Sequence, residues 1–559
     1  MSTLFKTKEK KFIVLSIALI VIQMIICIIV GYNKRNLFCD EVFTYGLSNC
    51  EDYAFLNKET FDSLGHNGWV DAEFLQHYVD VDEETPWSFK AAYNNQVADV
   101  HPPLYYFLMH FMCILFGGSF TKWSGLVLNL IILLGIDLAL FYVGRSVFKN
   151  DKLKAILPIV LWSCSAVGLS NIVFIRMYLL LTLECILFVA VHIGMLKELK
   201  DNENGKVFTV KRLVYLALVV IAGGLTHYYF YPFAFFFGAS VSVVLLARKK
   251  IKSILIYIGT MLAAFGINLL IFPETIHHVF DRARGTEVLS NLTGRTGDIY
   301  PQYISMINRS MFGGLLLPLF IICVLAGIVL FIRKRRLDGG EQGERTEKKK
   351  KEKGLIPLIL NARTDNLLFS LICIATYGFL IIAIQGSQLI ANRYIWQAYP
   401  FFAIIAVKLI MTVFSGFIKQ KYVVYTISGI YCVLLCILSI FSYGIEYMYA
   451  DYDEEVVKTA DLKGCDCIAY NRYDWIDDYT TFFISLDYDE TYLIKPNELD
   501  SVSDILKGRR TESKLVLWVP TLVDEEETTE FLNKVMNQVG YSEYIFRGDY
   551  LRMQVFELK

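Results

Sequence analysis

Long apolar runs, separated by short polar stretches, recur along the first 445 positions of the chain. A helix of about 20 apolar residues is long enough to cross the roughly 30 Å hydrocarbon layer of a membrane. The runs predict eleven spanning helices, at 12–31, 124–148, 155–174, 177–196, 213–226, 231–247, 254–272, 315–332, 367–385, 395–414 and 423–444. The sequence therefore predicts a mainly α fold, a polytopic bundle of membrane helices.

Composition supports this class, because 55% of the residues are hydrophobic and only 19% are charged. Soluble domains have about 45–50% apolar and about 25% charged residues. The first apolar run, preceded by KTKEKK, resembles a signal peptide, but GYNKRN follows it in place of a small-residue cleavage site. We expect an uncleaved first helix whose N-terminus lies in the cytoplasm.

The apolar stretch 101–116 decides the orientation of everything that follows it. If it crossed the membrane, the basic clusters at 145–154, 248–250 and 333–353 would lie outside the cell, against the positive-inside tendency. The stretch is also short and contains two prolines near its start. We therefore expect it to lie in the outer interface of a multi-pass plasma-membrane protein.

The charge divides the chain into two parts, since residues 446–559 carry a net −13 and residues 1–445 a net +12. The basic residues cluster beside apolar runs, which indicates orientation in the membrane and not binding of nucleic acid. In the acidic part, helix-like segments at 502–507 and 525–539 alternate with strand-like runs, namely CIAY, TFFIS, TYLI, KLVLWV and YLRMQVFEL. This pattern predicts a small extracytoplasmic α/β domain at 446–559 behind a membrane module at 1–445. The polar stretch 338–353 predicts a disordered cytoplasmic loop.

This orientation gathers several polar residues on the outer face, namely Asp40, Glu41, Asp99, His101, Arg176, Tyr178, His227 and Arg393. Tyrosines at the ends of spans are typical interfacial anchors. Arginines are not favoured there by orientation, and the planar fork of Arg176 and Arg393 suits recognition of a phosphate. The alternative for both is simple snorkelling of the side chain to the interface.

Asp40 and Glu41 form an adjacent acidic pair shortly after the first span. Such a pair can bind a divalent cation, or one carboxylate can act as a general base while the other orients it. An acidic pair in an exposed loop is more often only structural, so the pair is weak evidence by itself. Whether the protein uses a metal stays open.

Together, these motifs are more specific than any of them alone. The first-loop acidic pair, DVHPPLYYFLMH at 99–110, the stretch 165–196 with its Arg-Met-Tyr, and NRYIWQAYPFFAII beginning at Asn392 resemble the C-type (GT-C) integral-membrane glycosyltransferases. The resemblance covers most of 1–445 and is nearest to the bacterial branch related to lipid A aminoarabinose transferases and protein O-mannosyltransferases. One departure is NIVFI before Arg176, where many relatives have a more polar run.

The resemblance implies transfer of a sugar from a polyprenyl-phosphate carrier to a lipid, cell-envelope glycan or protein acceptor on the outer face. It makes Asp40 the candidate base, with Glu41 as its partner or as a metal ligand. It assigns Arg176, Tyr178 and Arg393 to the lipid phosphate, where positive charge would stabilise the leaving group. Asp99 and His101 would border the substrate.

The main alternative is a lipid or glycolipid transporter, because Asp137, Glu184 and Lys408 lie within predicted spans. Transporters commonly show internal repeats and polar residues near mid-membrane. No internal repeat is evident in this sequence, and the three residues have no common spacing. A membrane-anchored binding protein whose C-terminal domain is the functional part is a third possibility, for which eleven spans are excessive.

Overall fold

A computed structural model describes residues 2–64, 68–201, 208–295, 297–338, 362–473, 487–507, 514–550 and 552–559. These residues form two compact units, the first made of 1–30, 100–105 and 129–446, and the second of 31–99, 106–128 and 447–559. The predicted strand TFFIS and the predicted loop beyond residue 338 lie outside the described residues.

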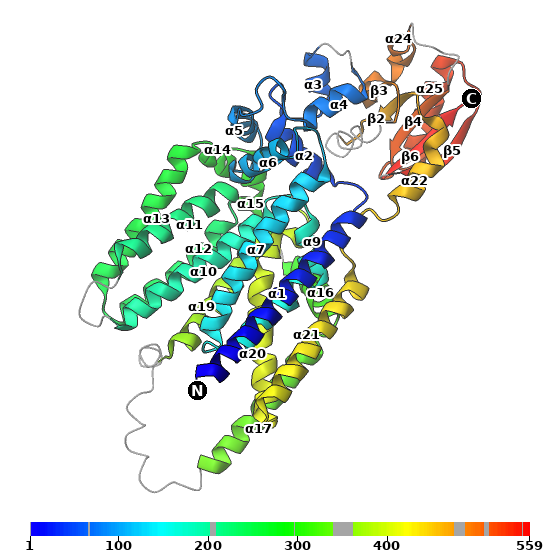
Figure 1. Cartoon of the computed structure of the whole chain (residues 1–559). Helices are drawn as coiled ribbons and strands as arrows, with labels where there is room; N and C mark the ends of the chain where they lie inside the picture. The colour runs from blue at the N-terminus through cyan, green and yellow to red at the C-terminus, as the bar shows by residue number, and fades with distance from the viewer. Residues whose placement is uncertain are drawn as a thin grey trace. The chain divides into compact units, whose positions relative to one another are not determined.

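The first unit is built from helices, several of which run side by side in Figure 1, such as α10 to α13. Two helices begin or end in the other unit, α1 (Ser2–Asn33) and α7 (Lys122–Val147). The others are α8 (Lys152–Ser163), α9 (Ala166–Val173), α10 (Tyr178–Asp201), α11 (Val210–Thr226), α12 (Phe230–Ala247), α13 (Ile251–Ile271), α14 (Thr275–Phe280), α15 (Ala283–Gly294), η1 (Gly297–Ile299), α16 (Tyr300–Phe312), α17 (Leu316–Asp338), α19 (Thr364–Gln385), η4 (Asn392–Ala398), α20 (Tyr399–Phe417) and α21 (Lys421–Tyr443).

Within the described residues, nine helices are long and apolar enough to cross a membrane, and the bent pair α8–α9 would make a tenth. The one predicted span that remains, 213–226, corresponds to α11. This helix has 17 residues and includes Lys211 and Arg212 in its first turn. The stretch predicted to lie in the interface forms α6 (Leu104–Leu115), whose 12 residues are too few to cross the hydrocarbon layer. The predicted fold class, a mainly α membrane protein with a small α/β domain, is thus confirmed.

The predicted span at 155–174 is not one straight helix, because α8 and α9 meet at an angle of 68°. Ser165 begins α9 as its N-cap residue, and its hydroxyl accepts a hydrogen bond from the backbone N–H of Gly168 at 3.3 Å. The hydroxyl of Ser439 accepts from the backbone N–H of Ala166, another donor at this helix start, at 2.9 Å. Serine caps inside an apolar run therefore replace a continuous span by two short helices.

A glycine is required just after this bend, because a Cβ at position 168 would lie 1.9 Å from the carbonyl oxygen of Trp162. We expect Gly168→Ala to destabilise the protein by about 1–3 kcal/mol, as overpacking against backbone does. Gly259→Ala is the matched control, since a Cβ at 259 in α13 meets nothing within 4 Å. Thermal unfolding in one detergent would measure both variants. Equal melting temperatures would contradict the prediction.

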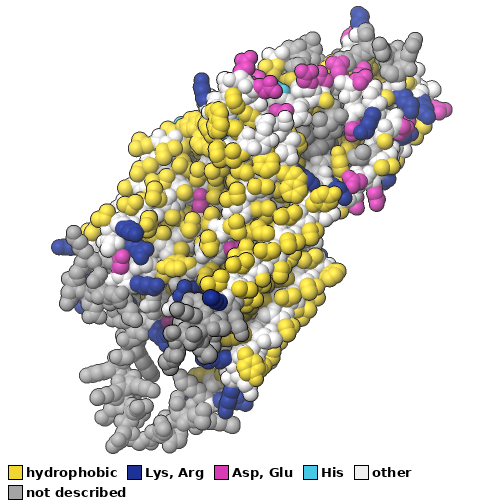
Figure 2. Space-filling view, viewed as in Figure 1, with side chains coloured by type: hydrophobic (Ala, Val, Ile, Leu, Met, Phe, Trp, Pro, Cys, Tyr) yellow, Lys and Arg dark blue, Asp and Glu magenta, His cyan; other side chains and the backbone are white. Residues whose placement is uncertain are grey.

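The surface of the first unit is that of a lipid-facing protein. In Figure 2 hydrophobic side chains cover the visible face of its helices almost without interruption. Large apolar side chains are exposed along several helices, for example Leu138 at 70%, Leu270 at 82% and Phe441 at 85%. Soluble monomers rarely expose apolar surface on this scale, so these helices are membrane-embedded.

The second unit contains a six-stranded sheet with the strand order β1-β3-β2-β4-β6-β5. Its strands are β1 (Trp69–Val70), β2 (Asp466–Tyr470), β3 (Thr491–Ile494), β4 (Leu515–Pro520), β5 (Tyr544–Tyr550) and β6 (Met553–Leu558). The central strand β2 is parallel to β3 and β4, and the other pairs are antiparallel. The edge strand β1 comes from the loop after the first span, which the sequence did not predict.

The amphipathic α25 (Glu525–Val539) packs on this sheet and contributes to its core. Phe531 and Val535 of α25 pack with Ile468, Leu517 and Phe556 of the strands. The predicted helix at 525–539 is confirmed, and the predicted helix at 502–507 is the single turn α24 (Val502–Ile505). The remaining helices are α2 (Cys39–Asn49), α3 (Lys58–Ser63), α4 (Ala72–Val79), α5 (Lys90–Ala98), α6, α22 (Tyr452–Thr459), η5 (Ala460–Leu462) and η6 (Pro496–Ser501).

Candidate functional site

Arg176 lies in the break between α9 and α10, and its side chain is buried, with 4% exposed. The break leaves backbone carbonyls without helical partners, and such groups need other donors when they are buried. The amide of Asn129 on α7 supplies them, donating to the carbonyl oxygens of Ile172 and Phe174 at 2.9 Å each. The hydroxyl of Tyr105 donates to Asn129 Oδ1 at 3.3 Å. A buried amide thus fixes the backbone that carries Arg176.

Aromatic and imidazole rings gather beside this break. The ring centroid of His227 lies 5.7 Å from that of His101 and 5.6 Å from that of Tyr178. Both histidines are at most 9% exposed and Tyr178 is 4% exposed. Three of the predicted site residues, His101, Arg176 and Tyr178, are therefore brought together, with His227 as an additional member.

Burial sets the protonation state of His227 in this cluster. Burial is the main reason that the pKa of His227 lies well below its usual value. The positive charges of His101 and Arg176 lower it further. The backbone N–H of Tyr229 donates to Nδ1 of His227 at 3.0 Å, so the neutral ring carries its proton on Nε2. His227 is therefore a neutral hydrogen-bonding group of the cluster and adds no positive charge to that of Arg176.

The other predicted phosphate ligand, Arg393, lies on η4, next to the same cluster. Trp396 of η4 packs edge-on against Tyr178 and Phe174, with ring centroids 5.8 and 5.6 Å apart. Tyr394 packs against Tyr229 at 6.1 Å. The short helix that carries Arg393 is thus held against the residues that flank Arg176.

A half-buried carboxylate, Glu446, accompanies Arg393. The amide of Asn392 donates to Glu446 at 3.4 Å, and the hydroxyl of Tyr399 donates to Asn392 Oδ1 at 2.6 Å. Burial raises the pKa of Glu446, while hydrogen bonds from Asn392 and Tyr443 and the charge of Arg393 oppose that rise. This network fixes the N-terminal end of η4, where Arg393 lies.

The predicted acidic pair lies in the second unit, at the start of α2. Glu41 is fully buried, and its Oε2 accepts from Lys34 Nζ at 2.9 Å and from the backbone N–H of Phe38 at 2.7 Å. Asp40 is half-buried, and its backbone carbonyl accepts from the hydroxyl of Thr44 at 2.9 Å. Glu41 therefore fixes the first turn of α2, whereas the neighbouring Asp40 is the more accessible acid.

Asp99, the remaining predicted site residue, ends α5 as its C-cap residue in the second unit. Its backbone N–H donates to the carbonyl oxygen of Asn95, and its side chain is half-buried. Across the described residues, no group of three or more His, Cys, Asp or Glu side chains is arranged to hold a metal ion. A cation at Asp40 and Glu41 would need oxygen ligands from a substrate or from water.

The ionisable residues inside the spans contact three different helices. Gln23 Nε2 of α1 donates to Asp137 at 3.3 Å, Thr226 donates to Glu184 at 2.8 Å, and Lys408 donates to the carbonyl of Val147 at 3.0 Å. Hydrogen bonds of this kind join neighbouring membrane helices. Each of the three residues thus has a partner on a different neighbouring helix.

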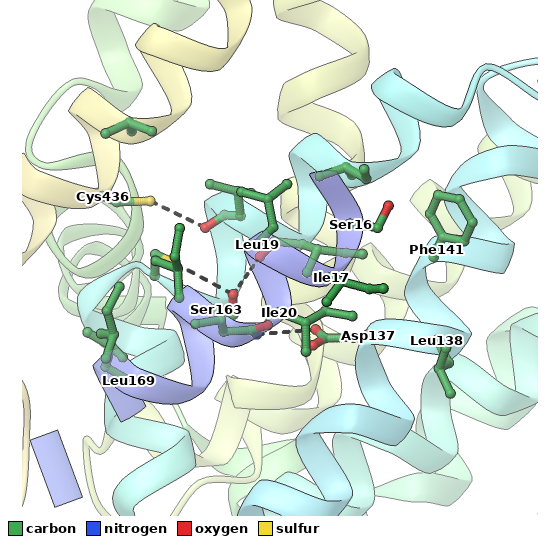
Figure 3. A pocket seen from close by; sticks show the side chains of 18 of the residues that line it. Ser16, Ile17, Leu19, Ile20, Asp137, Leu138, Phe141, Ser163, Leu169 and Cys436 are labelled. Carbon is green, nitrogen blue, oxygen red and sulfur yellow. Dashed lines mark hydrogen bonds between the residues drawn. The ribbon is translucent and has the colours of Figure 1, made fainter. Parts of the chain in front are cut away.

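Asp137 also borders a cavity of about 580 Å³ between α1, α7, α8, α9 and α21. Figure 3 shows that Leu138, Phe141 and Leu169 share its wall with Asp137 and Ser163. Most of the lining is apolar, with residues such as Ile17, Ile20 and Val433. A hydrophobic cavity at membrane depth with one carboxyl differs from a polar transport path.

We expect Asp137→Asn to leave function intact and to lower stability by less than about 1 kcal/mol, because an amide can still pair with Gln23. Thermal unfolding and the transfer assay described below measure the two quantities. Loss of function at unchanged stability would contradict this expectation and favour the transporter alternative, in which an intramembrane acid is essential.

Several residues of the site were missed or left without a role in the sequence analysis. His227 stands in the conspicuous run THYYFYP, but a histidine at a span end is commonly an interfacial anchor. Asn129 carries a signal that could have been used, since an amide in an apolar span usually has a buried partner. Lys34 and Glu446 follow the ends of spans, where charges are common, and nothing in the sequence distinguishes them.

No protein-family model matches the chain, and a search of curated proteins finds no match. Among solved structures, ArnT from Cupriavidus metallidurans bound to undecaprenyl phosphate aligns with 97% of this chain and 98% of that chain, at 10% identity and a TM-score of 0.47. The apo structure of the same protein gives a TM-score of 0.48 at the same identity and coverage.

A second solved structure is more distant and only partly covered. It is the archaeal oligosaccharyltransferase AglB from Archaeoglobus fulgidus, in complex with an inhibitory peptide and a dolichol-phosphate. The alignment covers 82% of this chain and 66% of that chain, at 10% identity and a TM-score of 0.39. ArnT and AglB are both GT-C glycosyltransferases, the class that the sequence motifs resemble.

Proposed function

We propose that this protein is a membrane glycosyltransferase that moves a sugar from a polyprenyl-phosphate carrier to an acceptor hydroxyl at the outer face of the cell membrane. The observation that carries the proposal is the buried cluster of Arg176, His227, His101 and Tyr178 at the break between α9 and α10. The planar guanidinium of Arg176 can bind a phosphate in two places, and a lipid phosphate matches its charge.

The chemistry assigns separate tasks to the two units. The acceptor hydroxyl loses its proton to the carboxylate of Asp40 as its oxygen attacks the anomeric carbon. The bond from that carbon to the phosphate oxygen breaks, and its electron pair leaves with the polyprenyl phosphate. Arg176 and Arg393 stabilise the negative charge that develops on the leaving phosphate. A single displacement of this kind inverts the anomeric configuration.

The other residues hold these groups in place. Tyr178 and His101 both pack against His227, and we assign them to the donor side of the cluster. Glu41 fixes the start of α2 and with it the neighbouring Asp40. We assign Asp99 to the residues that border the substrate. If the reaction uses a divalent cation, Asp40 and Glu41 are the residues of this chain that would hold it.

The proposal includes an orientation in the membrane. The N-terminus and the basic loops, such as 145–154 and 248–250, lie in the cytoplasm, in keeping with the positive-inside tendency. The second unit, with Asp40 and the acidic sheet domain, then lies outside. Modification of single introduced cysteines by an impermeant reagent in intact cells would test this, and labelling at 145–154 would contradict it.

The decisive experiment supplies the purified protein, in nanodiscs, with a panel of polyprenyl-phosphate sugars and a cell extract as a source of acceptor. Release of free polyprenyl phosphate is followed for each donor. Release that depends on one sugar would support the proposal and identify the donor. No release from any donor, by folded protein, would overturn it and favour lipid transport.

A further inference from the structure

Lys34 is a fully buried lysine that connects two distant parts of the second unit. Its Nζ donates to Glu41 Oε2 at 2.9 Å and to the backbone carbonyl of Tyr447 at 2.6 Å. The side chains of Lys34 and Glu41 are both 0% exposed. One ammonium group thus joins the N-terminal turn of α2 to Tyr447, the first residue of the C-terminal segment 447–559.

The burial of this pair is unusual enough to need a reason. Removing an ammonium group from water costs several kcal/mol, which close partners must offset. Burial lowers the pKa of Lys34, and the carboxylate of Glu41 acts in the opposite direction. Replacing a buried ion pair by apolar side chains of similar volume is often neutral or stabilising, so this charged pair points to the position of α2 more than to stability.

Neighbouring contacts strengthen the same connection. The backbone N–H of Arg35 donates to the carbonyl of Met448 at 2.9 Å, and its guanidinium pairs with Asp453 at 3.3 Å. The rings of Phe38 and Tyr447 pack 5.1 Å apart. The residues before α2 are therefore held by the first residues of the C-terminal segment through backbone, ionic and aromatic contacts.

A second attachment lies further along the same loop. Strand β1 pairs with β3, with Trp69 opposite Tyr492. Lys58 is 5% exposed, and its Nζ donates to the hydroxyl of Tyr492 at 3.2 Å and pairs with Glu498 at 3.3 Å. The loop that carries Asp40 is thus fastened to the C-terminal domain at two places more than 20 residues apart.

We infer that the C-terminal domain positions the catalytic loop, and that Lys34 is the positioning residue through which it holds Asp40. The inference rests on the proposed function, since it gives Asp40 the role of base. It assigns the acidic C-terminal domain a task within the transfer reaction, beyond covering the membrane module. Lys34 contacts Glu41 and Tyr447. It acts on the reaction only by fixing the position of α2, which carries Asp40.

The test compares Lys34→Met with Lys90→Met, which changes an exposed lysine of the same loop. Lys34→Met removes the hydrogen bond to the Tyr447 carbonyl and leaves the Glu41 carboxylate buried without its cation. Amide hydrogen exchange of residues 39–49 reports the order of α2 without any need for activity. Turnover and the KM for the lipid donor are measured in parallel.

We expect Lys34→Met to speed exchange at 39–49 by about tenfold or more, and to lower kcat by about 10²-fold at an unchanged donor KM. Lys90→Met should match the wild type in both measurements. Unchanged exchange in Lys34→Met would overturn the inference, as would faster exchange with normal kcat. A wild type without transfer activity would refute the proposed function, while exchange would still decide whether Lys34 holds α2.

Discussion

Asp40→Asn is expected to lower sugar transfer by about 10²- to 10⁴-fold, the range over which general-base catalysis contributes. Asparagine has nearly the shape of aspartate but cannot accept the acceptor's proton at neutral pH. Expression and binding of the lipid donor should stay close to wild type, because the donor phosphate is assigned to the first unit. Release of polyprenyl phosphate and a separate donor-binding measurement check the two statements.

The matched control is Asp52→Asn, in the same loop. Asp52 is an exposed carboxylate that pairs with His77 at 2.8 Å, with 61% of its side chain exposed. Its loss should change turnover little, since exposed ion pairs contribute little. Near-normal turnover in Asp40→Asn would remove Asp40 from the role of base, and an equal loss in both variants would point to a general effect of charge in the loop.

Arg176→Ala is expected to lower kcat/KM for the lipid donor by about 10²- to 10³-fold, the cost of removing one stabilising group from a developing anion. The KM for the acceptor should change far less. Arg176→Lys should lie between wild type and alanine, because lysine keeps the charge but lacks the planar fork that binds a phosphate in two places. Steady-state kinetics with donor and acceptor varied separately measures these effects.

Arg284→Ala serves as the control for the loss of an arginine, since Arg284 on α15 is exposed to solvent. It should behave as the wild type toward both substrates. A loss in Arg176→Ala that is equal for donor and acceptor would indicate that Arg176 supports the break between α9 and α10 and does not bind the donor.

The membrane helices were largely predictable from the sequence because apolar length is read directly from composition. The nine long helices and α6 correspond to predicted segments. The bend between α8 and α9 was not predicted, since Ser165 is a single polar residue within an apolar run and its capping bond is visible only in three dimensions. The short α11 was predicted to span because its apolar character is clear while its length is marginal.

The residues of the candidate site were also predictable only in part. His101, Arg176 and Tyr178 belong to motifs, and the structure brings them together. The partners that hold them, such as Asn129 and Trp396, are defined by contacts between helices far apart in sequence, which no local pattern records. The same holds for Lys34, whose partner Tyr447 is more than 400 residues away.

The pairing of β1 with β3 also has a consequence for biosynthesis. Trp69 and Tyr492 are 423 residues apart, so β1 leaves the ribosome long before its partner exists. At about 5–20 residues per second, this delay is about 20–80 s. During that time the loop with Asp40 has no sheet to join, and the machinery for transfer stays incomplete until the last fifth of the chain has been translated. Premature termination after α21 would thus leave an inserted but inactive protein.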